Sequence, residues 1–210
     1  MPEYTSDWFS HNIPHWQRHV IEKLPAGPIR WLELGAFEGR SACWVYDNVI
    51  APRGGTLSCL DSWWKDDYEQ RFDANMAGKT IEKIKSRTHP WLMQNQGKRT
   101  FQVIYVDADH EAKSVLLDGA LSWPMLETGG FMIFDDYTWN HPEPKGKVGL
   151  ELRQGRDRRS DATVGRARTR EFKRHEADAD ACLLARSPLA DHRLEDVRLF
   201  GGGQPQQALC

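Results

Sequence analysis

Short hydrophobic runs alternate with segments of helical periodicity over the first two thirds of this chain. Runs rich in β-branched, aliphatic and aromatic residues, of the length of buried strands, occupy 29–34, 56–60, 101–106 and 131–134. Between the last two runs, apolar residues recur mostly three or four positions apart, as on the buried side of a helix: Val115, Leu116, Ala120, Trp123 and Leu126. Gly129 and Gly130 are expected to end that helix. The pattern predicts an α/β fold with a doubly wound, mostly parallel sheet and helices on both faces.

Carboxylates directly follow the last two runs. Asp107 comes after 101–106, and Asp135 and Asp136 come after 131–134. Parallel strands joined by right-handed crossovers point the same way, so we expect these three acids to converge at one edge of the sheet. A hard divalent cation prefers such oxygen ligands and would offset the repulsion between them. In the structural alternative, Asp107 or Asp109 caps the following helix and Asp136 lies in a turn.

A glycine-containing loop follows the first predicted strand, at 33–41. Its spacing is G-x-x-x-G, between Gly35 and Gly39. Glycine permits a tight turn with close backbone approach to a ligand, and the helix start that follows favours an anion. The spacing differs from the G-x-G-x-x-G of dinucleotide-binding proteins, so a nicotinamide cofactor fits poorly.

Polar residues also follow the strand at 56–60 and a further short strand predicted at 79–85, at Asp61 and Ser86 respectively. An acid at the end of the second strand is placed to accept both hydroxyls of a ribose. The adjacent Trp63 and Trp64 could lie against an adenine, or they could pack in the core. Because every predicted strand ends in a glycine or a polar residue, we expect a ligand site at this edge.

The length and net charge limit the classes of protein to which this chain can belong. The chain has 210 residues, enough for one full-size core, and a formal net charge of −2, which does not suggest a nucleic-acid partner. No apolar run has membrane-spanning length, and the N-terminus lacks the layout of a signal peptide. The four cysteines show no zinc or redox spacing. A cytoplasmic protein without a membrane partner is expected.

The segments WLELGAFEGRSA and FQVIYVDADHEAKSVLLDGALSWPMLETGGFMIFDDYTW resemble the motifs of class I S-adenosylmethionine-dependent methyltransferases. The resemblance covers about residues 28–142. It is to the metal-dependent small-molecule O-methyltransferases of the catechol, caffeoyl-CoA and sugar types, which have a Rossmann-like fold. It implies that S-adenosylmethionine is held by the residues of the glycine loop and of the next two strand ends: Glu33, Gly35, Ala36, Phe37, Gly39, Ser41, Asp61, Trp63 and Ser86.

The resemblance also implies a Mg²⁺ site and a catalytic base. Asp107, Asp135 and Asp136 match the metal ligands, although the catechol enzymes have asparagine at the third position. His110 matches the catalytic lysine of the catechol enzymes, and Asp109 matches the aspartate base proposed for the sugar enzymes. Both remain candidates for the base.

The composition changes after Gly149. All nine tryptophans and all five tyrosines precede it, and the residues that follow contain eleven arginines and one lysine. Since methyltransferases of this class close the sheet with an antiparallel strand pair, we expect that pair to be degenerate or missing, with short candidates at Leu183–Leu184 and Val197–Phe200. The predicted organisation is an N-terminal helical cap (1–27), a cofactor-binding domain (28–149) and an atypical tail (150–210) that is disordered or read out of frame.

These observations favour an enzyme that transfers a methyl group from S-adenosylmethionine to a small hydroxylated acceptor with the help of Mg²⁺. A homodimer is one arrangement that would complete the acceptor pocket. The alternative is a non-catalytic S-adenosylmethionine-binding module with a truncated methyltransferase fold. In the N-terminal cap, Asn12 is expected to cap a helix whose first turn contains Pro14.

Overall fold

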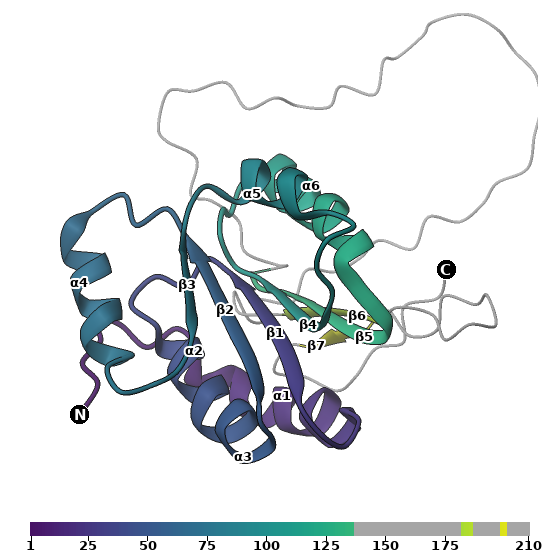
Figure 1. Ribbon diagram of the computed structural model, residues 1–210, viewed down its shortest axis with the longest axis horizontal. Helices are drawn as coiled ribbons and strands as arrows, with labels where there is room; N and C mark the ends of the chain where they lie inside the picture. The colour runs from purple at the N-terminus through teal and green to yellow at the C-terminus, as the bar shows by residue number, and fades with distance from the viewer. Residues whose placement is uncertain (137–181, 187–197, 201–210) are drawn as a thin grey trace, which may run out of the picture.

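A seven-stranded sheet forms the centre of the fold within residues 1–136, 182–186 and 198–200, which the computed structural model describes (Figure 1). The strand order is β3-β2-β1-β4-β5-β6-β7, with β1 to β5 parallel and β6 and β7 antiparallel to their neighbours. The bounds are β1 Ile29–Leu34, β2 Gly55–Asp61, β3 Glu82–Lys85, β4 Phe101–Val106, β5 Leu126–Phe134, β6 Cys182–Arg186 and β7 Arg198–Phe200. The predicted α/β fold with a mostly parallel sheet is confirmed.

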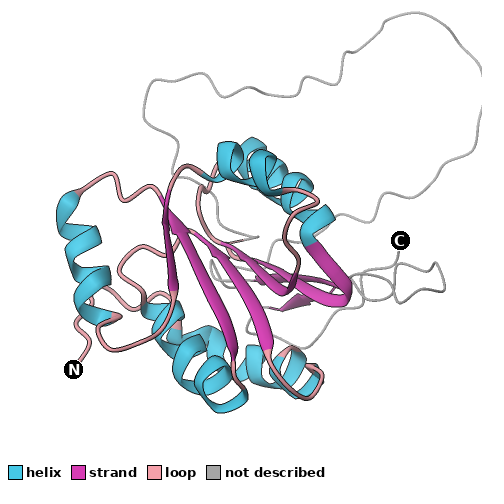
Figure 2. Cartoon of the chain, in the orientation of Figure 1, coloured by secondary structure: helices cyan, strands magenta, loops and turns pink. Residues whose placement is uncertain are grey.

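Helices cover both faces of the sheet, as predicted (Figure 2). Helices α1 to α3 lie against one face, and α5 and α6 lie against the other (Figure 1). The α-helices are α1 Ile13–His19, α2 Arg40–Val45, α3 Ala51–Arg53, α4 Asp66–Asn75, α5 Thr88–Asn95 and α6 Ala112–Ser122. Shorter turns are η1 Ser10–Asn12, η2 Ile21–Lys23, η3 Tyr46–Ile50 and η4 Trp123–Met125.

Each central strand sends alternate side chains to the two faces. On β1, Trp31 belongs to the core beneath α1 and α2, and Leu32 belongs to the core beneath α5 and α6. Tyr105 and Ile104 divide in the same way on β4. Because both faces are covered, these strands read as continuous hydrophobic runs without alternation in the sequence.

The N-terminal cap packs onto this sheet through aromatic and aliphatic side chains. Phe9, Trp16 and Val20 are buried in the same core cluster as Trp31. The ring of Trp16 lies 5.5 Å from that of Trp31 and 5.0 Å from that of Phe9. The cap therefore shares a core with the domain that follows it.

The closing strand pair, which was expected to be degenerate or missing, is present and short. β6 pairs with β5 from Phe131–Arg186 to Phe134–Leu183, and β7 pairs with β6 over three residues. β6 includes the candidate Leu183–Leu184, and β7 covers the last three residues of the candidate Val197–Phe200. Backbone pairing, of β6 with β5 and of β7 with β6, forms these strands although their sequences show no clear alternation of polar and apolar side chains. The rest of the predicted tail lies outside the described residues.

The packing of α6 differs from the prediction. Its buried positions are the small or polar residues Ser114, Asp118, Gly119 and Ser122. By contrast, Leu116 is 72% exposed, and Val115 is only partly buried. Gly119 is required at the contact with β5, since a Cβ there would lie 2.8 Å from the ring of Phe134. The helix comes too close to the strand for large side chains on that face.

Gly129 and Gly130 do not end the helix, because they lie inside β5. The pairing of β4 with β5 shifts register between Phe101 and Val103, opposite this part of β5. Gly129 has a φ of +79°, and a Cβ on Gly130 would lie 2.7 Å from the carbonyl oxygen of Gln102. The two glycines therefore serve a bulge and a close backbone approach within the strand.

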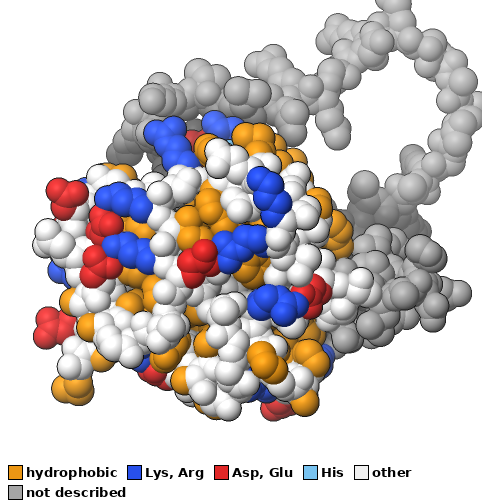
Figure 3. Space-filling model, in the orientation of Figure 1, with side chains coloured by type: hydrophobic (Ala, Val, Ile, Leu, Met, Phe, Trp, Pro, Cys, Tyr) orange, Lys and Arg blue, Asp and Glu red, His pale blue; other side chains and the backbone are white. Residues whose placement is uncertain are grey.

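The surface over the β3 side of the sheet carries interspersed basic and acidic side chains (Figure 3). Several are paired, such as Lys83 with Glu69 and Asp73, and Arg99 with Glu82. This face does not present a continuous basic stripe of the kind that tracks a phosphate backbone. Among the described helices, none combines the length and the apolar character needed to cross a membrane.

Candidate active site

Backbone hydrogen bonds align the carboxyl ends of the parallel strands at one rim. The N–H of Asp107 donates to the carbonyl of Leu34 at 2.8 Å, and the N–H of Asp135 donates to that of Val106 at 3.0 Å. Farther along the rim, Gly35 N–H donates to Leu60 at 2.8 Å. The strand-end residues singled out in the sequence therefore lie side by side, as predicted for a parallel sheet.

Gly35 permits the closest approach at this rim. Its φ is +88°, and a Cβ at this position would lie 2.0 Å from the carbonyl oxygen of Asp107. Both a left-handed conformation and direct contact between two strand ends thus require glycine. The same approach places the acidic cluster beside the glycine loop.

We expect Gly35→Ala to destabilise the protein by about 3 kcal/mol or more, since it adds a backbone clash to the roughly 1 kcal/mol cost of a left-handed alanine. Gly78→Ala is the matched control, because Gly78 has a φ of +80° with nothing within 4 Å of its Cβ position. Urea denaturation measures both. Equal losses of unfolding free energy in the two variants would show that the close approach at Gly35 is unimportant.

Glu33 lies beneath the glycine loop with one oxygen lacking a partner. Its side chain is fully buried, Ser41 donates a hydrogen bond to Oε1, and Oε2 has no hydrogen-bond partner among the described residues. Burial raises the pKa of Glu33 to about 8, against the lowering effect of the Ser41 hydrogen bond, and the charge of Asp61 raises it further. A buried, unpartnered carboxylate oxygen is suited to a cationic group of a ligand.

Asp61 supports the glycine loop through backbone hydrogen bonds. Its Oδ2 accepts from the N–H of Phe37 at 2.9 Å, and its Oδ1 accepts from the N–H of Trp63 at 2.7 Å. The indole of Trp63 donates to the carbonyl of Phe37 at 2.8 Å and packs 4.7 Å from the ring of Phe72. Trp63 is 2% exposed, so the geometry favours the packing alternative for its ring. Trp64 is 72% exposed.

The remaining predicted cofactor residues lie around this loop. Ser86 is beside Asp61, to whose carbonyl its N–H donates at 2.9 Å. Gly39 has a φ of +82° and precedes α2, and Ala36 is buried beneath the loop. The structure thus brings the predicted residues together around the carboxyl ends of β1 and β2.

The three acids at the ends of β4 and β5 form one electrostatic cluster. The hydroxyl of Tyr105 contacts Asp107 Oδ2 at 3.1 Å and also Asp135 Oδ2. Burial raises the pKa of Asp107 well above its usual range, the charges of Asp135 and Asp136 raise it further, and the Tyr105 hydrogen bond only partly offsets them. The cluster therefore disfavours three simultaneous negative charges, and a bound proton or a divalent cation would relieve their repulsion.

One subset of this cluster has the geometry of a metal site. Ligand atoms of Asp107, His110 and Asp136 all lie within 4.8 Å of one another. Asp136 has a φ of +52°, an unusual conformation for a residue other than glycine, which directs its carboxylate toward this group. The predicted ligand Asp135 lies outside this subset, and its oxygens contact Tyr105 and Asn12. Among the described residues, the converging set is thus two of the three predicted ligands plus a histidine.

The two candidate bases have different environments. His110 Nδ1 lies 2.9 Å from Asp136 Oδ2, and this hydrogen bond raises the pKa of His110 despite partial burial, with further raising by nearby carboxylates. Asp109 Oδ1 accepts from the N–H of Glu111 at 2.9 Å, two residues on, which forms a turn before α6, and no side chain caps that helix. Although partial burial raises the pKa of Asp109, hydrogen bonds from Glu111 and Ser114 and nearby positive charges bring it below its usual value. Asp109 is therefore the weaker base.

Comparison with known proteins assigns the chain to a family. The family described as "Methyltransferase domain" matches residues 32–137, half of the chain, and this range contains the glycine loop and all three acids. The chain belongs to the methyltransferase-domain family. The predicted resemblance to class I S-adenosylmethionine-dependent methyltransferases is thereby confirmed at the level of family and fold.

Two further proteins are similar to this methyltransferase-family chain. An O-methyltransferase from Bacillus cereus, solved in complex with SAH, has a TM-score of 0.51 and 18% identity, over 63% of this chain and 59% of that one. The uncharacterized protein R132 of Acanthamoeba polyphaga mimivirus is 22% identical over 132 residues, 59% of this chain and 60% of its own length. The chain thus spans about three fifths of the length of these relatives, and the structural likeness is one of fold.

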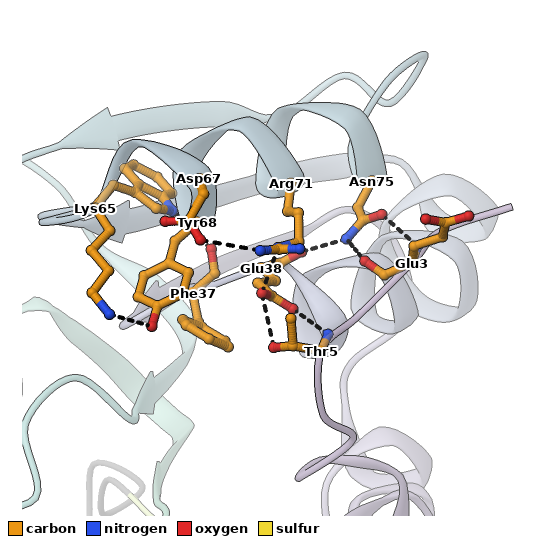
Figure 4. A network of polar contacts seen from close by, with 10 residues as sticks. Glu3, Thr5, Phe37, Glu38, Lys65, Asp67, Tyr68, Arg71 and Asn75 are labelled. Atoms are coloured by element: carbon orange, nitrogen blue, oxygen red, sulfur yellow. Dashed lines mark hydrogen bonds and ion pairs between the residues drawn. The ribbon is translucent and has the colours of Figure 1, made fainter.

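The methyltransferase rim includes an N-terminal contact that the sequence did not predict (Figure 4). Glu38, which is 1% exposed, accepts hydrogen bonds from the backbone N–H and the hydroxyl of Thr5 at 2.7 and 3.0 Å and pairs with Arg71 at 2.9 Å. Asn75 donates to the carbonyls of Glu3 and Glu38 at 2.9 and 2.8 Å. The first residues of the chain are therefore fastened to the glycine loop and to α4.

A groove of about 530 Å³ extends from the acidic cluster along α6. Asp107, His110, Asp135 and Asp136 line one end, and Val115, Leu116, Ala120, Trp123, Met132 and Phe134 are among the apolar residues of the other. Of the apolar residues that the sequence placed on the buried side of this helix, all but Leu126, which is buried in β5, thus line an open groove among the described residues. Tyr137, Trp139, Asn140 and His141, which by their place directly after Asp135 and Asp136 in the sequence are expected to wall the acceptor pocket, lie outside the described residues.

Proposed function

We propose that this protein is an S-adenosylmethionine-dependent O-methyltransferase that acts on a small hydroxylated acceptor with the help of a divalent cation. The observation that carries the proposal is the position of the acidic cluster, Asp107 with Asp136, directly beside the glycine loop at Gly35. A sulfonium methyl donor in that loop and a hydroxyl group at the cluster would then be neighbours. Transfer between them requires close, in-line placement.

The glycine loop suits the methionine part of the cofactor. Glu33 offers a buried carboxylate oxygen without a partner, which fits the positively charged amino acid end of S-adenosylmethionine. Asp61, at the end of β2, remains the proposed ribose ligand. The Bacillus cereus O-methyltransferase, which shares the fold, was solved with SAH, and this supports the same class of cofactor here.

The acidic cluster suits a divalent cation by charge and by the chemistry of its donors. Asp107 and Asp136 would supply carboxylate oxygens, and His110 lies beside them with its Nδ1 held by Asp136. Carboxylates suit Mg²⁺ and Mn²⁺, and imidazole also suits transition metals. Such an ion would lower the pKa of an acceptor hydroxyl and fix its direction. The protein groups around it would hold the acceptor and receive its proton.

His110 is the group that we propose as the proton acceptor. Asp136 holds its Nδ1, so the ring is oriented by a carboxylate in the manner of many catalytic histidines. We expect His110→Gln to lower kcat for methyl transfer by about a hundredfold or more. Asp109→Asn should lower it less than about threefold, because the side chain of Asp109 is engaged in the turn before α6.

Steady-state rates of the two variants, compared with their melting temperatures, decide between these bases. A loss of activity in Asp109→Asn that matches or exceeds the loss in His110→Gln would reverse the assignment. If both variants retain wild-type kcat, neither residue is the base and the proton leaves by another route.

A methyl-transfer assay tests the function itself. Labelled S-adenosylmethionine is incubated with panels of catechols and of hydroxylated sugars, with Mg²⁺ or with a chelator. We expect transfer to at least one panel and its loss with the chelator. Binding of S-adenosylmethionine without transfer to any acceptor would favour the alternative, a non-catalytic cofactor-binding module.

A further inference from the structure

A buried tyrosine lies directly beneath the acidic cluster. Tyr105 is 1% exposed and is the next-to-last residue of β4, two positions before Asp107. Because side chains two residues apart on a strand share a face, Tyr105 and Asp107 project from the same side of the sheet. Its register partners are Glu33 on β1 and Ile133 on β5, so Asp135 lies on this side too.

The contacts of Tyr105 explain why its hydroxyl is needed. The hydroxyl contacts Asp135 Oδ2 and lies 3.1 Å from Asp107 Oδ2. On the other oxygen of Asp135, Oδ1, the side-chain amide of Asn12 donates at 3.4 Å. Asp135 is therefore contacted on both oxygens by neutral groups from two different elements, β4 and the N-terminal cap.

The tyrosine ring is itself held in place. Trp16 of α1 packs edge-on against it, with ring centroids 4.7 Å apart and an interplanar angle of 83°. Val103 and Ile133 are apolar neighbours of the ring on the same face. A phenylalanine would fill this space equally well, and a buried hydroxyl is costly without a partner. The hydroxyl of Tyr105 finds its partners in the carboxylates of Asp107 and Asp135.

Asn12 does not act as the helix cap that the sequence predicted. No side-chain cap hydrogen bond is present at the start of α1, and Asn12 is 3% exposed. Its amide reaches the rim at Asp135 instead. This contact joins the N-terminal cap to the end of β5, over 123 residues of sequence.

We propose that Tyr105 is a positioning residue of the active site, which fixes the carboxylate of Asp135 beside Asp107, with Asn12 as its second support. Tyr105 acts through these acids and does not touch the acceptor. Fixed in this way, Asp135 contributes its charge to the cation site from a set distance and leaves Asp136 and His110 to face the ligand. The proposal rests on the proposed function for its catalytic consequence only.

The test is Tyr105→Phe, which removes the hydroxyl and keeps the ring. We expect the dissociation constant for Mn²⁺, measured by calorimetry, to rise about tenfold, as for other groups that orient metal ligands. We expect kcat to fall about tenfold while KM for S-adenosylmethionine stays within twofold, because the glycine loop is untouched. Tyr46→Phe is the matched control, since the Tyr46 hydroxyl accepts from the N–H of Thr80 at 3.2 Å, away from the rim.

A double-mutant cycle with Asp135→Asn separates positioning from general destabilisation. If Tyr105 acts through Asp135, the two substitutions together should weaken Mn²⁺ binding no more than about twofold beyond Asp135→Asn alone. Wild-type Mn²⁺ affinity and kcat in Tyr105→Phe would overturn the proposal, and so would full additivity of the two losses.

Failure of the proposed function is distinguishable from failure of this inference. A wild-type protein that transfers no methyl group contradicts the proposed function, whereas the Mn²⁺ affinities of the four cycle members still decide the role of Tyr105. If the wild type binds no Mn²⁺ at all, the role of Tyr105 at a cation site is refuted.

Discussion

Asp107→Asn is expected to abolish most methyl transfer while making the cation-free protein more stable. Asp107 is central to the acidic cluster, so its loss should reduce kcat/KM by about a thousandfold, or ~4 kcal/mol of transition-state stabilisation. Its carboxylate is also desolvated and repelled by Asp135 and Asp136. A neutral amide of the same shape removes that repulsion, so we expect a gain in unfolding free energy of about 1–2 kcal/mol at pH 7.

The sign of the stability change follows from the raised pKa of Asp107. A carboxyl whose folded-state pKa lies above its unfolded value binds a proton more readily in the folded state, so the wild type should lose stability as the pH rises through the acidic range and beyond. This loss should be smaller in Asp107→Asn. Asp73→Asn is the control, because Asp73 is on the surface of α4 and pairs with Lys83.

Urea unfolding in the presence of a chelator and steady-state kinetics with the cation check both parts. Loss of activity together with loss of stability would indicate a structural role for Asp107. Full activity in Asp107→Asn would remove the acidic cluster from the mechanism.

Cofactor binding is expected to release a proton from Glu33. With a pKa of about 8, this buried carboxyl is protonated in about nine tenths of the empty molecules at pH 7. A cationic ligand favours the ionised form, so binding must drive the proton off. The affinity for S-adenosylmethionine should therefore fall by up to about tenfold for each pH unit below 8. The empty protein should itself lose stability as the pH rises from about 4.5 to about 8, since the folded state favours protonated Glu33.

Calorimetric titration at pH 7 in buffers of different ionisation enthalpy counts the released proton. We expect a value near one for the wild type and near zero for Glu33→Gln, with weaker binding that varies little with pH. Glu82→Gln is the control, because Glu82 pairs with Arg99 and its pKa is lowered, chiefly by the hydrogen bond from Arg99. A wild-type affinity that is independent of pH would contradict the assigned role of Glu33.

The arrangement of the site could be predicted because it follows from the general rules of parallel sheets. Parallel strands end at one rim, so acids at 107 and 135, far apart in sequence, are neighbours in space. The glycine spacing around Gly35 likewise reflects a local requirement of the backbone. The fold class and the convergence of the acids were therefore predictable from the sequence.

Contacts between distant side chains were not predictable from local patterns. Tyr105 reads as one more aromatic residue in a strand, and only the positions of β4, β5 and α1 reveal that its hydroxyl reaches Asp135. Asn12 fits the pattern of a helix cap, yet its amide is directed to the rim. A polar residue inside an apolar run, such as Glu33 or Tyr105, was the available signal.

The error at α6 has a similar physical origin. Helical periodicity identifies an apolar stripe but does not reveal how closely the helix approaches the sheet. Gly119 allows a close approach, so small and polar residues are buried and Leu116 is left exposed. The short strands β6 and β7 are hard to see in the sequence, because backbone pairing places them, β6 with β5 and β7 with β6.

The central claim is that a cation site and a sulfonium nucleoside site adjoin at the rim formed by β1, β4 and β5. Anomalous diffraction from crystals grown with S-adenosylhomocysteine and soaked in Mn²⁺ tests it most directly. The account predicts nucleoside density against the glycine loop and a manganese peak between Asp107 and Asp136. Nucleoside density at the loop without a manganese peak at these acids would contradict it.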